Sequence, residues 1–264
     1  MATTTVRIGA VGDLHYGRDS RETLKPLFQA VQEARPDVML LLGDLTDYGT
    51  VEEAQALTRE LVAGIKMPTL AVLGNHDFES GRQEEVSHIL ADSGLNMLDG
   101  EACEVNGIGI AGVKGFAGGF GTAALGPWGE PTIKQFVHEA VNEALKLEAS
   151  LARLRSKQQI VLLHYSPVRQ TVEGEPLEIY PFVGSSRLEE PISRFPVSLV
   201  VHGHAHRGRH EGRTKNDVPV YNVSMPLLAR SFPDRPPFRV FEVPGPAAGA
   251  SITRGRRATD AVAS

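Results

Sequence analysis

The sequence contains a single cysteine, Cys103. One thiol cannot form an intramolecular disulfide, and it excludes a zinc or iron–sulfur site built from several thiolates. Long apolar runs are also missing, because no stretch approaches the roughly 18 consecutive apolar residues that a membrane span requires. No basic and then apolar leader precedes the first predicted strand. We therefore expect no secretory signal, no membrane association and a cytoplasmic protein.

Basic residues are in slight deficit, with 27 Lys and Arg against 32 Asp and Glu and a net charge of −5. A protein that binds the nucleic-acid backbone concentrates basic side chains on one face. We therefore expect no nucleic-acid polymer among the partners. Hydrophobic residues make up 41% of the chain and charged residues 22%. This is the composition of an ordinary globular domain, and it excludes a mainly disordered chain.

The domain organisation predicted from these patterns is simple. Residues 1–245 show no internal repeat and no low-complexity linker, so we expect a single domain there. Residues 246–264 lose the apolar pattern, which predicts a flexible C-terminal tail.

What the sequence does contain is a series of short apolar runs separated by longer amphipathic stretches. Continuous apolar runs are typical of strands buried on both faces, and they occur at Val6–Val11, Val38–Leu42, Thr69–Leu73, Ile160–Leu163 and Val197–Val201. The amphipathic stretches predict helices over Thr23–Ala34, Val51–Lys66, Gln83–Asp92 and Ile133–Ser156. Two later pairs of runs predict hairpin-like additions, Glu101–Val105 with Ile108–Val113 and Val218–Val223 with Arg239–Val243. The alternation predicts an α/β fold of two packed sheets with helices outside.

Polar side chains follow each of the five buried runs. In chain order they are Asp13 and His15, Asp44 and Asp47, Asn75 and His76, His164, and finally His202, His204 and His206. Ligand sites of α/β sheets lie just beyond the carboxyl ends of strands. Unpaired polar groups at apolar strand ends are costly, and metal coordination accounts for all five groups at once.

Taken one at a time, these residues have simpler explanations. Asp13 and Asp47 each suit a turn or a helix N-cap, and His164 alone suits a buried structural histidine. For His202 we favour support of the neighbouring ligands or a structural role over direct coordination. The metal hypothesis depends on the five groups occurring together in one chain.

Carboxylate, amide and imidazole donors without a thiolate suit Mn²⁺, Fe, Zn²⁺ or Co²⁺. A single ion takes about four protein ligands, and the strand ends offer more donors than that. This predicts two ions that share a bridging carboxylate.

The series Asp13-x-His15, Gly43-Asp44-x-x-Asp47, Gly74-Asn75-His76-Asp77, His164 and Gly203-His204-x-His206 resembles the motifs of the calcineurin-like metallophosphoesterase family. The resemblance implies a four-layer α/β/β/α sandwich of two mixed β-sheets flanked by helices, holding a dinuclear centre. It implies one ion on Asp13, His15, Asp44 and His206, and a second on Asp44, Asn75, His164 and His204. It also implies that His76 lies near the leaving-group oxygen and is oriented by Asp47. The expected metals are Mn, Fe or Zn, with Mn best able to support activity.

The function implied is a metal-dependent phosphoesterase in which a hydroxide bridging the two ions attacks phosphorus in line with the leaving group. The acidic balance of the chain favours a small substrate, and we predict a nucleotide-like phosphodiester. Two alternatives stay open at this point. One is a phosphomonoesterase acting on a small metabolite, and the other is a non-catalytic scaffold in which the metal ions are structural.

Residues that contact the rest of the substrate are less evident. The composition of the glycine-rich segment 114–129 predicts one of two roles. It is either a mobile lid, with Phe120 stacking on a ring of the substrate, or a surface loop that could form a contact in a homo-oligomer. Arg169, Arg187 and Arg207 are the nearest candidates for holding phosphate. For each of these arginines a surface salt bridge is the more ordinary role.

Overall fold

Strands and helices alternate through the first part of the chain in the computed structural model, which describes residues 3–17 and 21–247. The elements there are β1 (Thr3–Val11), α1 (Arg21–Ala34), β2 (Val38–Leu42), α2 (Val51–Gly64), β3 (Thr69–Val72), the short 3-10 helix η1 (His76–Phe78), α3 (Gln83–Asp92) and β4 (Asn96–Met97). β1 to β4 pair in parallel, and β11 (Arg239–Ala247) adds antiparallel to β1. The first sheet therefore has the mixed order β11-β1-β2-β3-β4.

The second sheet is built from the remaining elements and has the order β5-β6-β7-β8-β10-β9. Its central strands are parallel, whereas the edge strands β5 and β9 run antiparallel. The elements are β5 (Ala102–Val105), β6 (Ile108–Val113), η2 (Gly121–Ala123), α4 (Pro131–Arg153), β7 (Gln159–Leu163), η3 (Arg169–Val172), η4 (Leu177–Ile179), α5 (Tyr180–Val183), α6 (Glu189–Ile192), β8 (Val197–His202), β9 (Glu211–Arg213), β10 (Pro219–Asn222) and α7 (Met225–Ser231).

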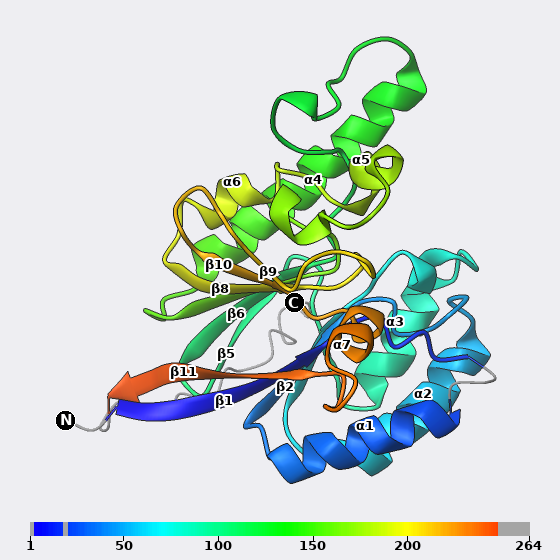
Figure 1. Cartoon of the computed structure of the whole chain (residues 1–264), viewed down its shortest axis with the longest axis vertical. Coiled ribbons are helices and arrows are strands. Elements are labelled where there is room, and N and C mark those ends of the chain that lie inside the picture. Colours follow the sequence, from blue (N-terminus) through cyan, green and yellow to red (C-terminus); the bar gives the residue numbers. More distant parts are fainter. Residues whose placement is uncertain (1–2, 18–20, 248–264) are drawn as a thin grey trace, which may run out of the picture.

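Side chains alternate between the two faces of each central strand and divide the interior into layers. Leu41 of β2 packs with the side chains of α1, α2 and α3, whereas Leu40 points to the other sheet. In β7, Leu162 faces the first sheet and Val161 packs against α4. Figure 1 shows α1 to α3 outside one sheet and α4 and α6 outside the other. This confirms the four-layer α/β/β/α sandwich of two mixed β-sheets.

A capping box fixes the start of α2 directly after the second polar block. The Thr50 hydroxyl accepts a hydrogen bond from the Glu53 main-chain N–H, and the Glu53 carboxylate accepts one from the Thr50 N–H. The loop from the end of β2 to this cap is therefore short and held at both ends. It carries Asp44 and Asp47.

One predicted strand pair is wrong. The run at 218–223 corresponds to β10 in the second sheet, whereas the run at 239–243 lies in β11 of the first. The helix α7 stands between them and carries the chain from one sheet to the other. Both runs have the local pattern of a strand, and that pattern does not specify the partner. The other predicted pair, β5 with β6, is confirmed as an antiparallel pair.

β11 continues to Ala247, so the first two residues of the predicted tail, 246–264, belong to a strand. The tail from residue 248 onward lies outside the described residues. Within the described part of the chain, no helix combines the length and apolarity needed to cross a membrane.

Candidate metal centre

The first group of predicted ligands meets where β1 and β8 end. The Asp13 Oδ1 atom lies 3.0 Å from His206 Nε2, and His15 Nε2 lies 3.4 Å from the same nitrogen. Asp13 is fully buried, and its carboxylate contacts the His206 ring and accepts a hydrogen bond from the His204 main-chain N–H in place of water. These three side chains offer donor atoms within 4.8 Å of one another.

The second group meets where β2, β3 and β7 end. His164 Nε2 lies 3.3 Å from Asp44 Oδ1 and 3.0 Å from Asn75 Oδ1. Asp44, His164 and His204 offer donor atoms within 4.8 Å of one another. The Asp44 carboxylate also lies 3.9 Å from His15 Nε2 of the first group. Asp44 is therefore the residue that joins the two groups, and all seven predicted ligands form one cluster.

Four of these residues adopt the left-handed backbone region that residues other than glycine rarely occupy. The φ angles are 61° at Asp13, 42° at His15, 46° at Asp44 and 69° at His204. Such conformations cost of order 1–3 kcal/mol each and persist where the surroundings impose them. Here the loops after β1 and β2 hold each other, because Asp13 N–H donates to the Gly43 carbonyl and His15 N–H to the Asp44 carbonyl, both at 2.9 Å.

The orientation of His164 tests whether a metal ion fits this cluster. His164 Nδ1 lies 2.9 Å from the Leu42 carbonyl, which can only accept, so Nδ1 carries a proton. The Nε2 of the neutral ring then presents a lone pair toward the oxygens of Asp44 and Asn75. Two acceptor oxygens opposite Nε2 call for a positive charge there, supplied either by a metal ion on the neutral ring or by a second proton on Nε2. A carbonyl that orients the far side of the ring is also the usual support of a metal-bound histidine. The donor set therefore fits a divalent ion.

The electrostatics of the cluster follow from burial and close opposite charges. Burial disfavours charge on Asp44, yet the His164 imidazole outweighs it and holds the pKa of the carboxyl below its usual range. Burial also opposes charge on His164, but Asp44 and Asp13 raise the pKa of that imidazole to about 9. Burial, together with the nearby His164, lowers the pKa of His204 to about 3. The cluster thus concentrates two carboxylates in a buried setting that attracts cations.

His76 is oriented by Asp47 through the main chain. His76 Nδ1 lies 2.8 Å from the Asp47 carbonyl oxygen, whereas the Asp47 carboxylate lies 3.4 Å from His15 Nδ1. The rings of His15 and His76 meet edge to face at 4.6 Å. The carbonyl requires a proton on His76 Nδ1, so Nε2 is the atom left for other contacts.

Asp77 is a structural part of the site to which the sequence reasoning assigned no role. Its fully buried carboxylate accepts hydrogen bonds from the main-chain N–H groups of Leu45, Thr46 and Gly74 and from the Thr46 hydroxyl. It thereby ties the loop after β2 to the loop after β3. Its place directly after His76 was a signal for a role at the site, but three of its four donors belong to Leu45 and Thr46, which are distant in the sequence.

His202 supports the neighbouring segments, as we favoured from the sequence. The side chain is fully buried, and Nε2 lies 2.8 Å from the Thr171 hydroxyl. Burial lowers the pKa of His202 to about 4. His202 therefore links β8 to η3 as a neutral ring.

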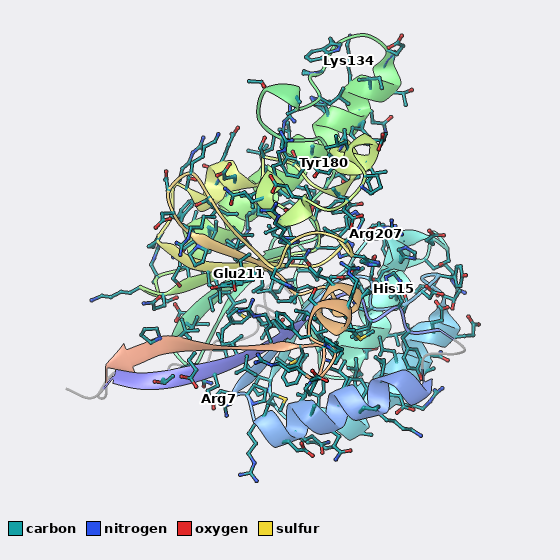
Figure 2. All side chains as sticks on the ribbon, viewed as in Figure 1. Arg7, His15, Lys134, Tyr180, Arg207 and Glu211 are labelled. Carbon is teal, nitrogen blue, oxygen red and sulfur yellow. The ribbon has the colours of Figure 1, made fainter. Side chains whose placement is uncertain are left out.

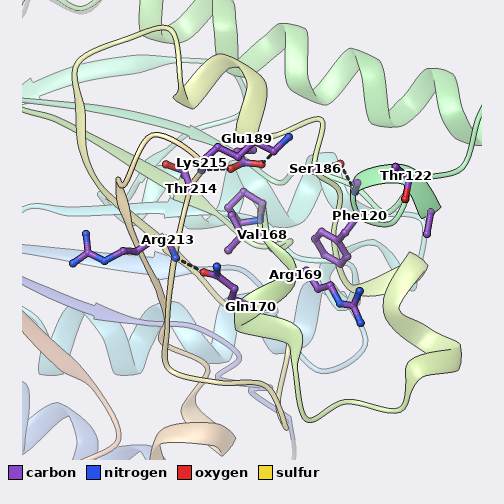
Figure 3. Close-up of a pocket in the computed structure, with 13 residues that line it drawn as sticks. Phe120, Thr122, Val168, Arg169, Gln170, Ser186, Glu189, Arg213, Thr214 and Lys215 are labelled. Carbon is purple, nitrogen blue, oxygen red and sulfur yellow. Dashed lines mark hydrogen bonds and ion pairs between the residues drawn. The ribbon is translucent and has the colours of Figure 1, made fainter.

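Two of the predicted substrate residues, Phe120 and Arg169, line a cavity of about 370 Å³ (Figure 3). The guanidinium of Arg169 lies 5.6 Å from the centre of the Tyr180 ring. The residues that line this cavity include none of the seven predicted ligands. Arg207 directly follows His206, and Figure 2 shows it on the same side of the molecule as His15.

Arg187 contacts the glycine-rich segment 114–129. Its Nη2 donates to the Leu125 carbonyl at 2.9 Å. The main-chain N–H groups of Gly118 and Gly119 donate to the carbonyls of Pro181 and Gly184. The segment is therefore attached by main-chain hydrogen bonds to α5 and to the residue that follows it.

Comparison with known proteins agrees with this geometry. Residues 6–208 match the sequence model of a family described as calcineurin-like phosphoesterase. A probable cyclic nucleotide phosphodiesterase from Vesicomyosocius okutanii subsp. Calyptogena okutanii is 23% identical over 223 residues, which cover 82% of this chain and 80% of that protein. A probable glycerophosphodiester phosphodiesterase, GpdQ, from Arcobacter nitrofigilis is 26% identical over 178 residues, which cover 66% of this chain and 58% of that protein.

Among solved structures, the phosphopantetheinyl hydrolase PptH from Mycobacterium tuberculosis has the same fold. It superposes with a TM-score of 0.64 at 18% identity, covering 91% of this chain and 97% of that one. The matched family segment contains all five polar blocks. The chain belongs to the calcineurin-like phosphoesterase family and is a metal-dependent phosphoric ester hydrolase.

Proposed function

We propose that this protein is a phosphodiesterase that hydrolyses a small, nucleotide-like phosphodiester at a dinuclear metal centre. The observation that carries the proposal is the convergence of seven oxygen and imidazole donors on one buried cluster joined by Asp44. Both curated relatives are named as probable phosphodiesterases, which favours a diester over a monoester.

In this proposal Asp13, His15 and His206 hold one ion, Asn75, His164 and His204 hold the other, and Asp44 serves both. Two divalent ions bound there would supply the Lewis-acid chemistry of the family, activating water and neutralising charge on the phosphoryl oxygens. Mn²⁺ is the metal we expect to support turnover, because each proposed ion has carboxylate or amide oxygens beside its imidazoles and Mn²⁺ accepts such oxygens readily.

His76 is the residue we assign to the leaving group. The Asp47 carbonyl holds a proton on Nδ1, so a protonated ring has its Nε2–H free to donate to the departing oxygen. General acid catalysis of this kind is worth about 10²–10⁴-fold. Of the four predicted substrate residues, Arg207 adjoins a proposed ligand in the chain, and we keep it as the proposed phosphate-binding residue.

The test is hydrolysis of bis-p-nitrophenyl phosphate and of p-nitrophenyl phosphate by chelator-treated protein, before and after addition of Mn²⁺. We expect restored activity with Mn²⁺ and faster turnover of the diester. Faster turnover of the monoester would make the protein a phosphomonoesterase. No turnover of either ester with Mn²⁺, Zn²⁺ or Fe²⁺ would contradict an enzymatic role and favour a metal-stabilised scaffold.

Two variants separate the proposed roles. Asp44→Ala should lose bound metal and activity together, because it removes the residue shared by the two groups. His76→Ala should lower kcat about 10²-fold or more while both metals stay bound. Metal content measured by mass spectrometry alongside kcat distinguishes the two, and full activity of either variant would refute its assignment.

A further inference from the structure

The pattern of polar residues at strand ends has a sixth member. β6 ends at Val113, and Lys114 follows it directly. Val113 pairs with Leu163 in the parallel ladder, so Lys114 lies beside His164 where β6 and β7 end. The Lys114 carbonyl accepts hydrogen bonds from the main-chain N–H groups of His164 and Tyr165, at 3.0 and 3.1 Å.

The Lys114 ammonium lies among aromatic rings. Nζ is 5.2 Å from the centre of the Phe78 ring, 5.0 Å from Phe116 and 5.3 Å from Tyr165. It donates one hydrogen bond, to the Gly115 carbonyl at 3.0 Å. Within the described part of the chain, no carboxylate forms an ion pair with it. An ammonium has three donors, so the cation retains the capacity to bind an acceptor.

Lys114 lines a cavity of about 420 Å³, a volume typical of small-molecule sites. Leu73, Phe78 and Met97 supply apolar walls, and Gln83 and Ser87 of α3 supply polar groups. A cavity that combines apolar walls with polar side chains suits an organic group that carries a small number of hydrogen-bonding atoms.

The cavity is lined by segments that also carry proposed ligands, although none of the seven ligands is itself in the lining. Leu73 stands two residues before Asn75, and Phe78 ends the 3-10 helix that begins at His76. Lys114 contacts His164 through the main chain. A substrate whose phosphate lies at the metal centre therefore has this cavity beside it.

Acidic side chains also line the cavity and restrict what it accepts. Glu84 and Glu101 lie in its lining, and Asp99 lies there paired with Lys146 at 3.0 Å. A second phosphate on the ligand would be repelled by these carboxylates. A neutral group with a carbonyl oxygen meets the ammonium without that repulsion.

We propose that this cavity binds the organic group of the phosphodiester and that Lys114 donates a hydrogen bond to a carbonyl oxygen of a neutral ring or amide there. The assignment rests on the proposed phosphodiesterase function, because it places the scissile phosphate at the metal centre. It names the substrate class: a diester of a neutral, carbonyl-bearing alcohol no larger than a nucleoside.

The test compares two diesters with the same leaving group, thymidine 5′-(p-nitrophenyl phosphate) and methyl p-nitrophenyl phosphate. Lys114→Met keeps the apolar stem and removes the charge. Ser87→Trp fills the cavity from α3 without removing Lys114. Lys134→Met is the matched control, because Lys134 lies on α4 at the top of the molecule in Figure 2, away from His15. Thermal unfolding establishes that each variant is folded.

We expect both cavity variants to raise KM for the thymidine ester at least tenfold, equivalent to about 1.4 kcal/mol. The kcat for this ester, and both constants for the methyl ester, should stay within twofold. The dissociation constant of thymidine 5′-monophosphate for the metal-loaded protein, measured by calorimetry, should rise by the same factor, and that of inorganic phosphate should not.

Equal losses on both esters would overturn the proposal, because Lys114 would then serve the scissile phosphate. Unchanged constants in both variants would also overturn it and leave Lys114 as a packing cation between rings. If neither ester is hydrolysed but thymidine 5′-monophosphate binding still weakens in the variants, the cavity assignment stands and the proposed phosphodiesterase function fails.

Discussion

A single methyl group at Gly74 should disable the metal centre. A Cβ at this position would lie 2.8 Å from the Asp44 Cγ atom and closer still to its main-chain nitrogen and Oδ1. Carbon atoms pack at about 3.5–4.0 Å. In Gly74→Ala the Asp44 carboxylate or the loop after β3 must therefore shift by about 1 Å.

The consequence of this shift is large because of what Asp44 holds. Its Oδ1 accepts the His76 main-chain N–H at 2.8 Å and lies 3.3 Å from His164 Nε2, and its carbonyl accepts the His15 N–H at 2.9 Å. A displacement of about 1 Å at a catalytic centre can cost about 10²-fold in rate. We expect a loss of that size in kcat/KM for bis-p-nitrophenyl phosphate, with weaker retention of Mn²⁺.

Backbone effects alone predict the opposite result. Gly74 does not need the left-handed conformation, and glycine to alanine at such a position stabilises a protein by about 0.4–1 kcal/mol through the unfolded state. The control is Gly81→Ala, at a φ of 72° with no heavy atom within 4 Å. It should cost about 1 kcal/mol in unfolding free energy and leave the metal content intact. A Gly74→Ala protein that retains its metal and full activity would refute the reasoning.

Three further predictions follow from individual contacts. Asp77→Ala leaves buried main-chain donors unpaired and should lower the unfolding free energy by roughly 3 kcal/mol in urea titrations; an unchanged midpoint would contradict this. Asp47→Asn keeps the carbonyl that orients His76 but loses the carboxylate beside His15, so Mn²⁺ affinity should fall about 10–100-fold while kcat at saturating metal falls less than in His76→Ala. Burial and the neighbouring Glu104 raise the pKa of Cys103 to about 11. The iodoacetamide labelling rate at pH 8 should then be about 200-fold below that of a free thiol, which ionises near pH 8.5, and should keep rising toward pH 11; a plateau near pH 9 would contradict it.

The strand pattern of the central sheets could be predicted from the sequence because both of their faces are buried. A continuous apolar run such as Val38–Leu42 needs a sheet with layers on both sides, and the observed strand has the predicted bounds. The polar residue after such a run must lie at the carboxyl end of its strand, and the carboxyl ends of neighbouring parallel strands lie together. The cluster of proposed ligands follows from this rule, and the same rule applied to β6 points to Lys114.

Contacts between distant segments could not be predicted in this way. The partner of β11 is β1, although β10 is nearer in the sequence, because α7 carries the chain across to the first sheet. Arg187 donates to the Leu125 carbonyl, and no local pattern around Arg187 encodes that acceptor. Hydrogen-bond partners of this kind depend on which loops the fold brings together.

By itself, the sequence determined the class of fold and the chemistry of the proposed centre. Apolar periodicity decides which faces are buried, and oxygen and imidazole donors without thiolates decide which ions are suitable. The tertiary structure decided the rest. It showed that the main-chain carbonyl of Asp47 contacts His76, that Asp77 ties two loops together, and that a cavity lies beside Lys114. The first two features depend on how the loops after β2 and β3 approach each other, and the cavity depends on how the two sheets pack.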